Sequence, residues 1–233
     1  MIGGIELGGT KCVLAVANNP LDIISKKIIG TSTPEKTFSE IYSFFSNYPV
    51  KKLGVGSFGP IVLNSESENY GIIVAESKDG WKDVNVVNYL ADICSDVSID
   101  TDVNAAAIGE YNYGLEDKYQ TLAYVTVGTG IGVGILLDGR PYRGNFHLEA
   151  GHMRIPNTNN YPGVCNLHGD CWEGLASGPS MKARWGIDPV ELPKDHEAWE
   201  IEAELLSLGL INIISNHSPD KIILGGGVMS QEH

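Results

Sequence analysis

The residues best suited to hold a metal ion lie in the C-terminal half of the chain. Cys165, His168 and Cys171 form a Cys-x-x-His-x-x-Cys run, and His152 precedes it. Two thiolates and two imidazoles suit tetrahedral Zn²⁺, and four protein ligands leave no open coordination position. We therefore predict a structural zinc site, with His147 as a less favoured alternative ligand. A cysteine-rich loop beside unrelated histidines is the competing interpretation.

Two turns rich in glycine and threonine could hold phosphate groups. Gly8-Gly9-Thr10-Lys11 and Gly128-Thr129-Gly130 each join two apolar segments. Glycine lets backbone N–H groups approach phosphate oxygens, and Lys11 could add a charged contact. The first turn lacks the residue order of a Walker A loop. One such turn is usually ordinary loop structure, but two in one chain, with a third at Gly225-Gly226-Gly227, favour nucleotide binding.

One carboxylate near the middle of the chain could act as a base. Asp102 follows a predicted strand over 97–100 and precedes a predicted helix. Phosphoryl transfer requires alignment, charge neutralisation and a base for the attacking hydroxyl, and a carboxylate at a strand end could reach into a cleft. Aspartate is also a common helix N-cap, and the residues alone favour that role for Asp102.

Alternating strands and helices must position these groups. Apolar patterning predicts strands over 2–7, 12–17, 52–57, 97–100, 122–127, 133–137 and 221–224. It predicts helices over 37–47, 86–94 and 103–113, and one more that contains Ala203, Leu206, Leu210 and Ile213. The stretch 151–169 is expected to be irregular. This order of elements indicates an α/β fold.

The strand–turn–strand pattern occurs twice, once at the N-terminus and once after residue 120. A period this long does not fit a solenoid, so we interpret the repetition as an internal duplication of one α/β unit. The helix that ends the first copy stops at glycine. We therefore place the domain boundary there, which divides the chain into an N-terminal lobe, 1–114, and a C-terminal lobe, 115–233.

Composition excludes several classes of partner. The 233 residues carry a formal net charge of −13, with no dense basic patch, which argues against a nucleic-acid partner. No apolar run approaches the length of a membrane span, and the N-terminus lacks the features of a signal peptide. We therefore expect a cytoplasmic protein with no membrane partner.

Three motifs together resemble the ROK family of repressors and sugar kinases. They are Gly8-Gly9-Thr10-Lys11 after Glu6, Asp102-Val103-Asn104-Ala105-Ala106-Ala107, and Val127-Gly128-Thr129-Gly130-Ile131-Gly132. The resemblance runs from the first strand to the last residue. It implies the two-lobed actin-like ATPase fold, in which a ribonuclease H-like unit is duplicated. Family members generally continue beyond the position matching His233, so we expect the second lobe to be truncated at its C-terminus.

The resemblance also implies a function and its cofactors. Glu6, where many members carry Asp, and the use of His168 in the zinc motif resemble the fructokinase branch. That branch implies ATP-dependent phosphorylation of a hexose, with D-fructose converted to D-fructose 6-phosphate as the leading expectation. ATP, Mg²⁺ and a structural Zn²⁺ are the implied cofactors, and sugar and ATP the small-molecule partners. Because the family often forms dimers, a homodimer is a further expectation.

The resemblance assigns roles residue by residue. Asp102 matches the catalytic base, and Glu6 would hold Mg²⁺ through water. Nucleotide binding is expected for Gly8, Gly9, Thr10, Lys11, Thr129, Gly130, Pro179, Gly225, Gly226, Gly227, Val228 and Met229. Sugar binding is expected for Gly59, Pro60, Asn104, Glu149, His152 and Glu173. For Glu149 and Glu173, ordinary surface glutamates remain the competing interpretation.

Four alternatives remain at this stage. A sugar-responsive repressor would need a helix-turn-helix before the first hairpin, which begins at residue 3. A zinc-ribbon interaction module would not bind ATP. The substrate could instead be glucose, mannose or an N-acetylated amino sugar, or the protein could bind sugar and nucleotide without catalysis.

Overall fold

The computed structural model describes residues 1–75 and 78–230, which form two compact units. The first unit contains Met1–Ala106 and Arg143–His147, and the second contains Ala107–Tyr142 and Leu148–His233. The chain therefore passes from one unit to the other three times. The predicted lobe boundary after residue 114 stays a prediction.

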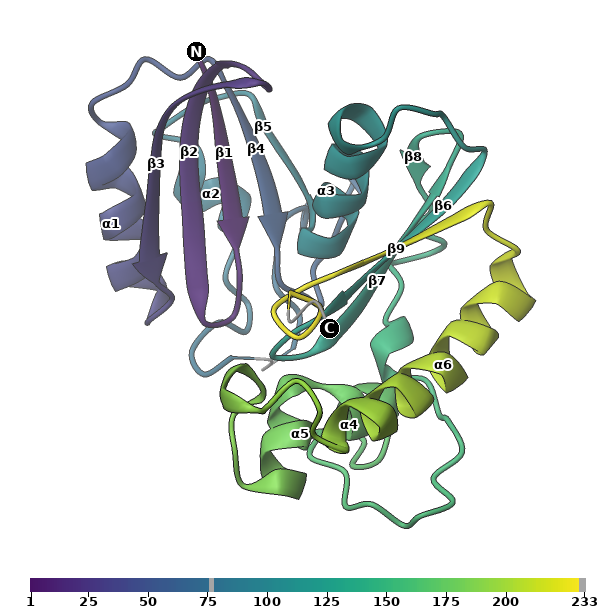
Figure 1. Ribbon diagram of the computed structural model, residues 1–233. Coiled ribbons are helices and arrows are strands. Elements are labelled where there is room, and N and C mark those ends of the chain that lie inside the picture. The colour runs from purple at the N-terminus through teal and green to yellow at the C-terminus, as the bar shows by residue number, and fades with distance from the viewer. Residues whose placement is uncertain (76–77, 231–233) are drawn as a thin grey trace. The chain divides into compact units, whose positions relative to one another are not determined.

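The first unit is built on a mixed five-stranded sheet (Figure 1). Its strands are β1 (Ile2–Leu7), β2 (Lys11–Asn19), β3 (Asp22–Gly30), β4 (Lys52–Ser57) and β5 (Val97–Thr101), in the order β3-β2-β1-β4-β5. β1 pairs antiparallel with β2 and parallel with β4, and β4 pairs parallel with β5. The predicted strands are confirmed. β3 was not predicted, because its isoleucines form two adjacent pairs around Lys26 and Lys27 and do not alternate with polar residues.

Helices bury the apolar face of this sheet. α1 (Pro34–Phe45) and α2 (Val86–Leu90) contribute to the same hydrophobic core as β1, β2 and β4. α1 begins earlier than predicted because the Thr33 hydroxyl accepts the Lys36 amide and proline occupies the first turn. α2 is shorter than predicted. α3 (Asp102–Gly109) follows β5 directly and continues as a π-helical segment, Glu110–Gly114.

The second unit repeats this strand pairing. Its sheet contains β6 (Thr121–Val127), β7 (Ile131–Leu137), β8 (Arg140–Pro141) and β9 (Lys221–Gly225), in the order β8-β7-β6-β9. β6 pairs antiparallel with β7 and parallel with β9, as β1 pairs with β2 and β4. The shared topology supports the internal duplication inferred from the sequence.

The two faces of β6 pack into two different hydrophobic cores. Ala123, Val125 and Val127 pack in the cluster formed with α4 (Trp172–Ala176), α5 (Gly178–Trp185) and α6 (Ala198–His217). Leu122 packs in a second cluster with Ala107. Short 3₁₀ segments, Ala150–His152 and Pro189–Glu191, interrupt the loops. α6 was predicted; α4 and α5 were not, because they are only 5 and 8 residues long and carry little helical periodicity.

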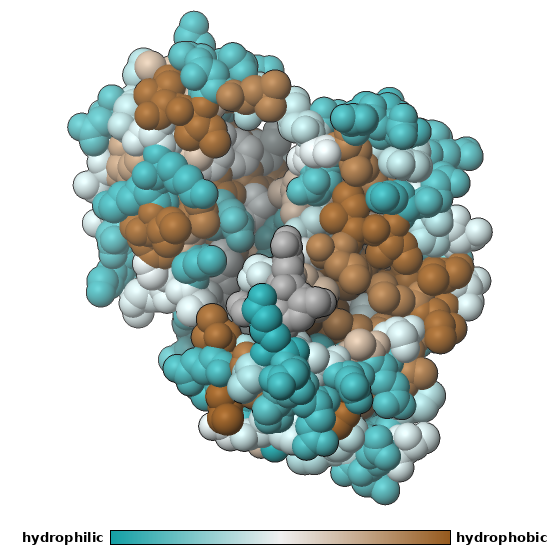
Figure 2. Space-filling model, viewed as in Figure 1, coloured by the Kyte–Doolittle hydropathy of each residue, from teal (hydrophilic) through white to brown (hydrophobic). Residues whose placement is uncertain are grey.

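The surface is mixed in polarity. Apolar side chains gather over β9 and the neighbouring part of α6, where Leu224, Ile211 and Ile214 are exposed (Figure 2). In the part of the chain that the structure describes, no helix combines the length and apolarity that crossing a membrane requires.

Candidate active site and metal centre

The candidate residues of the first unit lie at one edge of its sheet. β1, β4 and β5 run parallel, so their C-terminal ends meet at the same edge. β1 is followed by the turn 8–11, β4 by the turn with Gly59 and Pro60, and β5 by Asp102. The carboxyl ends of parallel strands are the usual place for ligand-binding residues in open α/β sheets.

Asp102 is the first residue of α3 and is only partly exposed. Its Oδ1 accepts the Val103 amide at 2.8 Å. The N-cap hydrogen bond comes from the preceding residue, since the Thr101 hydroxyl accepts the Asn104 amide at 3.2 Å. Thr101 thus performs the capping role that the residues alone favoured for Asp102.

Burial changes the acidity of this carboxyl group. Loss of solvent is the main cause that raises the pKa of Asp102 from 3.8 to about 6; the negative charge of Glu6 contributes to this rise, and the Val103 amide hydrogen bond opposes it. Glu6 itself lies on β1 with an exposed side chain. A carboxylate whose pKa lies close to neutrality is well suited to accept a proton.

A glycine in β4 permits this placement of Asp102. A Cβ atom at Gly56 would lie 2.8 Å from the Ala105 Cβ and 3.2 Å from the Asp102 Cα. Both are shorter than ordinary carbon–carbon contacts. The first turn of α3 therefore approaches β4 more closely than any other residue at position 56 would allow.

Hydrogen bonds fix the carbonyl groups of the turn 8–11. The Gly8 amide donates to the Lys11 carbonyl at 3.1 Å, and Thr31 binds the carbonyls of Gly8 and Thr10 at 2.6 and 2.9 Å. The amides of Gly9 and Thr10 have no acceptor among the residues that the structure describes. Unpaired amides in a fixed turn can bind an anion. Thr31 was not singled out by sequence, because it lies in the distant segment after β3.

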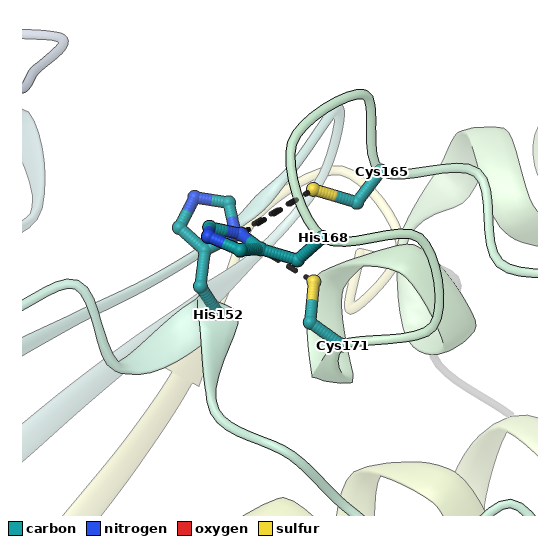
Figure 3. A group of neighbouring side chains, drawn as sticks. All are labelled: His152, Cys165, His168 and Cys171. Atoms are coloured by element: carbon teal, nitrogen blue, oxygen red, sulfur yellow. Dashed lines mark hydrogen bonds between the residues drawn. The ribbon is translucent and has the colours of Figure 1, made fainter.

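The predicted zinc ligands lie together in the second unit (Figure 3). Their four ligand atoms are all within 4.8 Å of one another. His152 Nδ1 lies 3.7 Å from the Cys165 Sγ and 3.6 Å from the Cys171 Sγ, and His168 Nδ1 lies 3.9 Å from the Cys165 Sγ. Tetrahedral zinc, with bonds of about 2.3 Å to sulfur and about 2.0 Å to nitrogen, separates its sulfur and nitrogen ligands by about 3.6 Å. The donor set therefore fits this metal.

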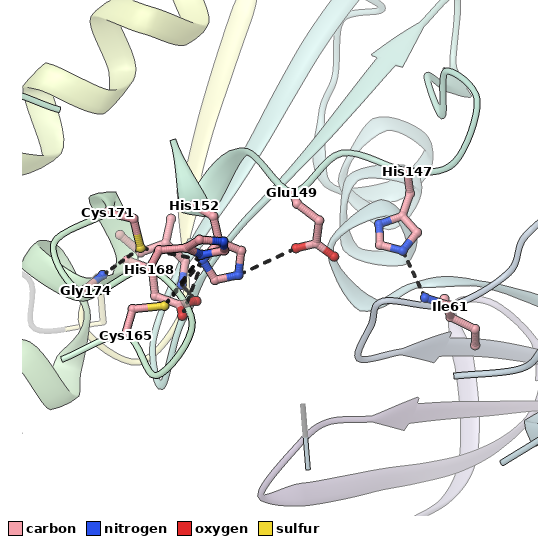
Figure 4. A network of polar contacts seen from close by, with 10 residues as sticks. Ile61, His147, Glu149, His152, Cys165, His168, Cys171 and Gly174 are labelled. Carbon is pink, nitrogen blue, oxygen red and sulfur yellow. Dashed lines mark hydrogen bonds and ion pairs between the residues drawn. The ribbon is translucent and has the colours of Figure 1, made fainter. Parts of the chain in front are cut away.

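His147 does not belong to this cluster. Its Nε2 accepts the Ile61 amide at 3.0 Å (Figure 4). Its ring stacks on Phe146. The cluster is held instead by local backbone contacts, since the amide of Cys165 donates to the Gly169 carbonyl and Gly174 donates to the Cys171 Sγ.

Two glutamates, Glu149 and Glu173, lie next to His152, and Figure 4 labels the first of them. Glu149 Oε2 is 4.0 Å from His152 Nε2, and Glu173 Oε1 is 3.9 Å from His152 Nδ1. The other oxygen of Glu173 accepts the Ile131 amide at 3.0 Å. Glu173 therefore connects the start of β7 to the metal cluster, which an ordinary surface glutamate would not do. If His152 bound zinc through its Nδ1, its Nε2 would remain available to Glu149 or to a bound ligand.

The predicted nucleotide residues of the second unit also come together. The Gly178 amide, at the start of α5 beside Pro179, donates to the Gly128 carbonyl at 2.8 Å. The Val228 amide donates to the Val127 carbonyl at 3.0 Å. These two contacts bring three segments to one place: the turn with Thr129 and Gly130, the N-terminus of α5, and the turn from Gly225 to Met229.

Known proteins resemble this chain in both sequence and fold. A fructokinase of Lactococcus lactis subsp. cremoris is 42% identical over 98% of this chain and 79% of its own length. The solved ROK hexokinase of Thermus thermophilus is 25% identical, with a TM-score of 0.76 over 97% of this chain and 82% of that chain.

A second solved structure, a ROK family glucokinase of Streptomyces griseus in complex with glucose and AMPPNP, has a TM-score of 0.77. It is 23% identical and aligns over 99% of this chain and 84% of that chain. The two units thus have the two-lobed actin-like ATPase fold expected from the sequence. Residues 2–233 match the ROK family as a whole, and the chain belongs to that family.

Proposed function

We propose that this protein transfers the γ-phosphoryl group of ATP to a hexose, and that the hexose is D-fructose, which becomes D-fructose 6-phosphate. The observation that carries the proposal is the pairing of a partly buried carboxyl group of raised pKa, Asp102, with an amide-lined turn at the same sheet edge. The relative named fructokinase, at 42% identity, supports the choice of substrate.

The chemistry assigned to Asp102 follows from this arrangement. Its carboxylate accepts the proton of the sugar hydroxyl while the hydroxyl oxygen forms its bond to the γ-phosphorus. The bond between that phosphorus and the bridging oxygen breaks, and ADP leaves with the electron pair. A pKa of about 6 keeps Asp102 ionised at neutral pH and still basic enough to take the proton.

Other residues bind and orient the reactants. The amides of Gly9 and Thr10, with Lys11, are assigned to ATP phosphates, as are the residues around Thr129. Mg²⁺, when bound, neutralises phosphate charge, and Glu6 fits a role in holding it because its carboxylate lies near enough to Asp102 to raise the pKa of that group.

The sugar contacts are assigned to Asn104 and the Gly59–Pro60 turn in the first unit. In the second unit they are assigned to Glu149, His152 and Glu173. We assign a structural Zn²⁺ to the four-residue cluster, because it keeps His152 and the start of α4, which carries Glu173, in fixed positions. Rigid sugar ligands favour one hexose over another.

ADP release with Mg²⁺-ATP tests the proposal. Fructose, glucose, mannose and N-acetylmannosamine should be compared at equal concentration, with the phosphorylated product identified by nuclear magnetic resonance. We expect the highest kcat/KM with fructose and phosphate at its 6-hydroxyl. Preference for another hexose would correct the substrate alone, whereas ADP release with none of them would refute the kinase assignment and favour a binding protein.

A further inference from the structure

One short segment, Arg143–His147, packs with the first unit although its neighbours in sequence belong to the second. Those neighbours are the residues up to Tyr142 and from Leu148. Each end of the segment makes a polar contact with first-unit residues beside the candidate sugar site. These contacts involve Asp100 and Ile61.

Arg143 binds a buried carboxylate. Its Nε donates to Asp100 Oδ2 at 3.2 Å, and its Nη2 donates to the same oxygen. Asp100 is 8% exposed, so its charge is largely removed from water. A buried carboxylate without a counter-charge is costly, and a guanidinium that binds it through two N–H groups offsets that cost.

Asp100 in turn orients a predicted sugar ligand. Its Oδ1 accepts the side-chain amide of Asn104 at 2.7 Å and the backbone amide of Thr101 at 2.8 Å. Both of its oxygens are therefore engaged, one by Arg143 and the other by the start of α3. The hydrogen bond to Asn104 fixes which side of that amide group faces Asp100.

The other end of the segment contacts the 59–61 turn. His147 is buried, and its Nε2 accepts the Ile61 amide at 3.0 Å, directly after Gly59 and Pro60. An accepting Nε2 requires the neutral ring in its Nδ1-protonated tautomer. The segment thus contacts Asp100, which is hydrogen-bonded to Asn104, and Ile61, which follows Gly59 and Pro60 in the chain. Asn104 and the Gly59–Pro60 turn are the first-unit residues that the proposed function assigns to the sugar.

We propose that Arg143 is a positioning residue of the sugar site, which acts through Asp100 to hold Asn104 in its binding orientation. This inference rests on the proposed function, because Asn104 contacts sugar only if that function is correct. Arg143 itself touches no reacting atom. The effect of removing it falls on sugar affinity and leaves the ATP site unchanged.

The test compares Arg143→Met with Arg140→Met, a matched control at an exposed arginine on β8. Loss of a charged hydrogen bond to a buried group weakens binding by about 10- to 100-fold. We therefore expect Arg143→Met to raise the KM for fructose by at least about tenfold, with the KM for ATP within about twofold of wild type. Arg140→Met should leave both values unchanged.

A double variant separates positioning from general damage. In Asp100→Asn/Arg143→Met the buried charge is gone, and the new amide oxygen can still accept from Asn104. We expect its fructose KM to lie closer to wild type than that of Arg143→Met alone. If Arg143→Met fails to fold, Arg143→Lys takes its place, with an intermediate KM because an ammonium keeps the charge without the two-pronged contact.

The outcomes distinguish the two proposals. A wild-type protein that turns over fructose, together with an unchanged fructose KM in the Arg143 variants, would overturn the positioning role alone. Equal losses for fructose and ATP, or no recovery in the double variant, would also overturn it. A wild-type protein that neither phosphorylates fructose nor binds it by calorimetry would refute the proposed function, and this inference with it.

Discussion

Replacing Asp102 by asparagine should make the protein more stable and nearly inactive. In the native state, burial raises the pKa of this carboxyl group from 3.8 to about 6. That rise corresponds to about 3 kcal/mol in favour of the protonated form. Because the side chain is partly exposed, water reduces the effect, and we expect a gain of about 1–3 kcal/mol for Asp102→Asn near pH 7.5.

The sign depends on pH. Between the unfolded and native pKa values, the native state binds more protons than the unfolded state, so wild-type stability falls as pH rises from about 4 through about 6. The variant lacks this loss. The stability difference should therefore be largest above pH 6 and shrink as pH is lowered toward about 4.

Urea unfolding of the ligand-free proteins, followed by tryptophan fluorescence at several pH values, measures this difference. Asp117→Asn, at an exposed position, is the control with the same change in net charge. Loss of the base should also lower kcat by about 10²–10⁴-fold. Equal stability of wild type and Asp102→Asn at every pH would refute the desolvation argument, and near-normal kcat would refute the catalytic role.

Three further predictions follow from packing, metal ligands and burial. Gly56→Ala should lower the Tm and kcat, because the added methyl group presses on the first turn of α3, whereas Gly54→Ala, whose Cβ meets nothing within 4 Å, should leave kcat unchanged; equal kcat values for the two variants would contradict this. Cys171→Ser should abolish zinc retention in metal analysis, whereas Cys94→Ser should retain zinc like the wild type. The metal site would be disproved if Cys171→Ser also retained zinc, or if the wild-type protein bound none. Burial raises the pKa of Glu202 to about 8, so the stability of the wild type should fall as pH rises from about 4.5 through about 8. The stability of Glu202→Gln should fall less over this range. Thermal melts in which Tm depends on pH in the same way for both proteins would rule this out.

Local sequence was sufficient for most elements of the fold. Strands with strong apolar patterning, such as β1, β4 and β6, were predicted at their observed positions. β3, α4 and α5 were missed because non-alternating strands and short helices carry little periodic signal. The repeated strand–turn–strand pattern also indicated the duplication that the two sheets share.

The metal cluster was predictable for a different reason. Three of its four residues lie within seven consecutive positions, so the chain needs only one loop to bring them together. His152 comes from a preceding segment, yet a bridge between Arg154 and Cys171 places that segment beside the loop. Residue type and short spacing therefore carried the information.

The sequence by itself determined most of the strands and helices, the grouping of His152, Cys165, His168 and Cys171, and the membership of the ROK family, because each depends on residues close together in the chain or on motifs of fixed order. The tertiary structure decided which carboxyl group loses its solvent and which residues hold the site in place. Arg143 donates hydrogen bonds to Asp100, and Thr31 donates one to the Gly8 carbonyl; both pairs are far apart in the sequence. Burial and such long-range hydrogen bonds arise only when distant segments pack together, so no local pattern encodes them.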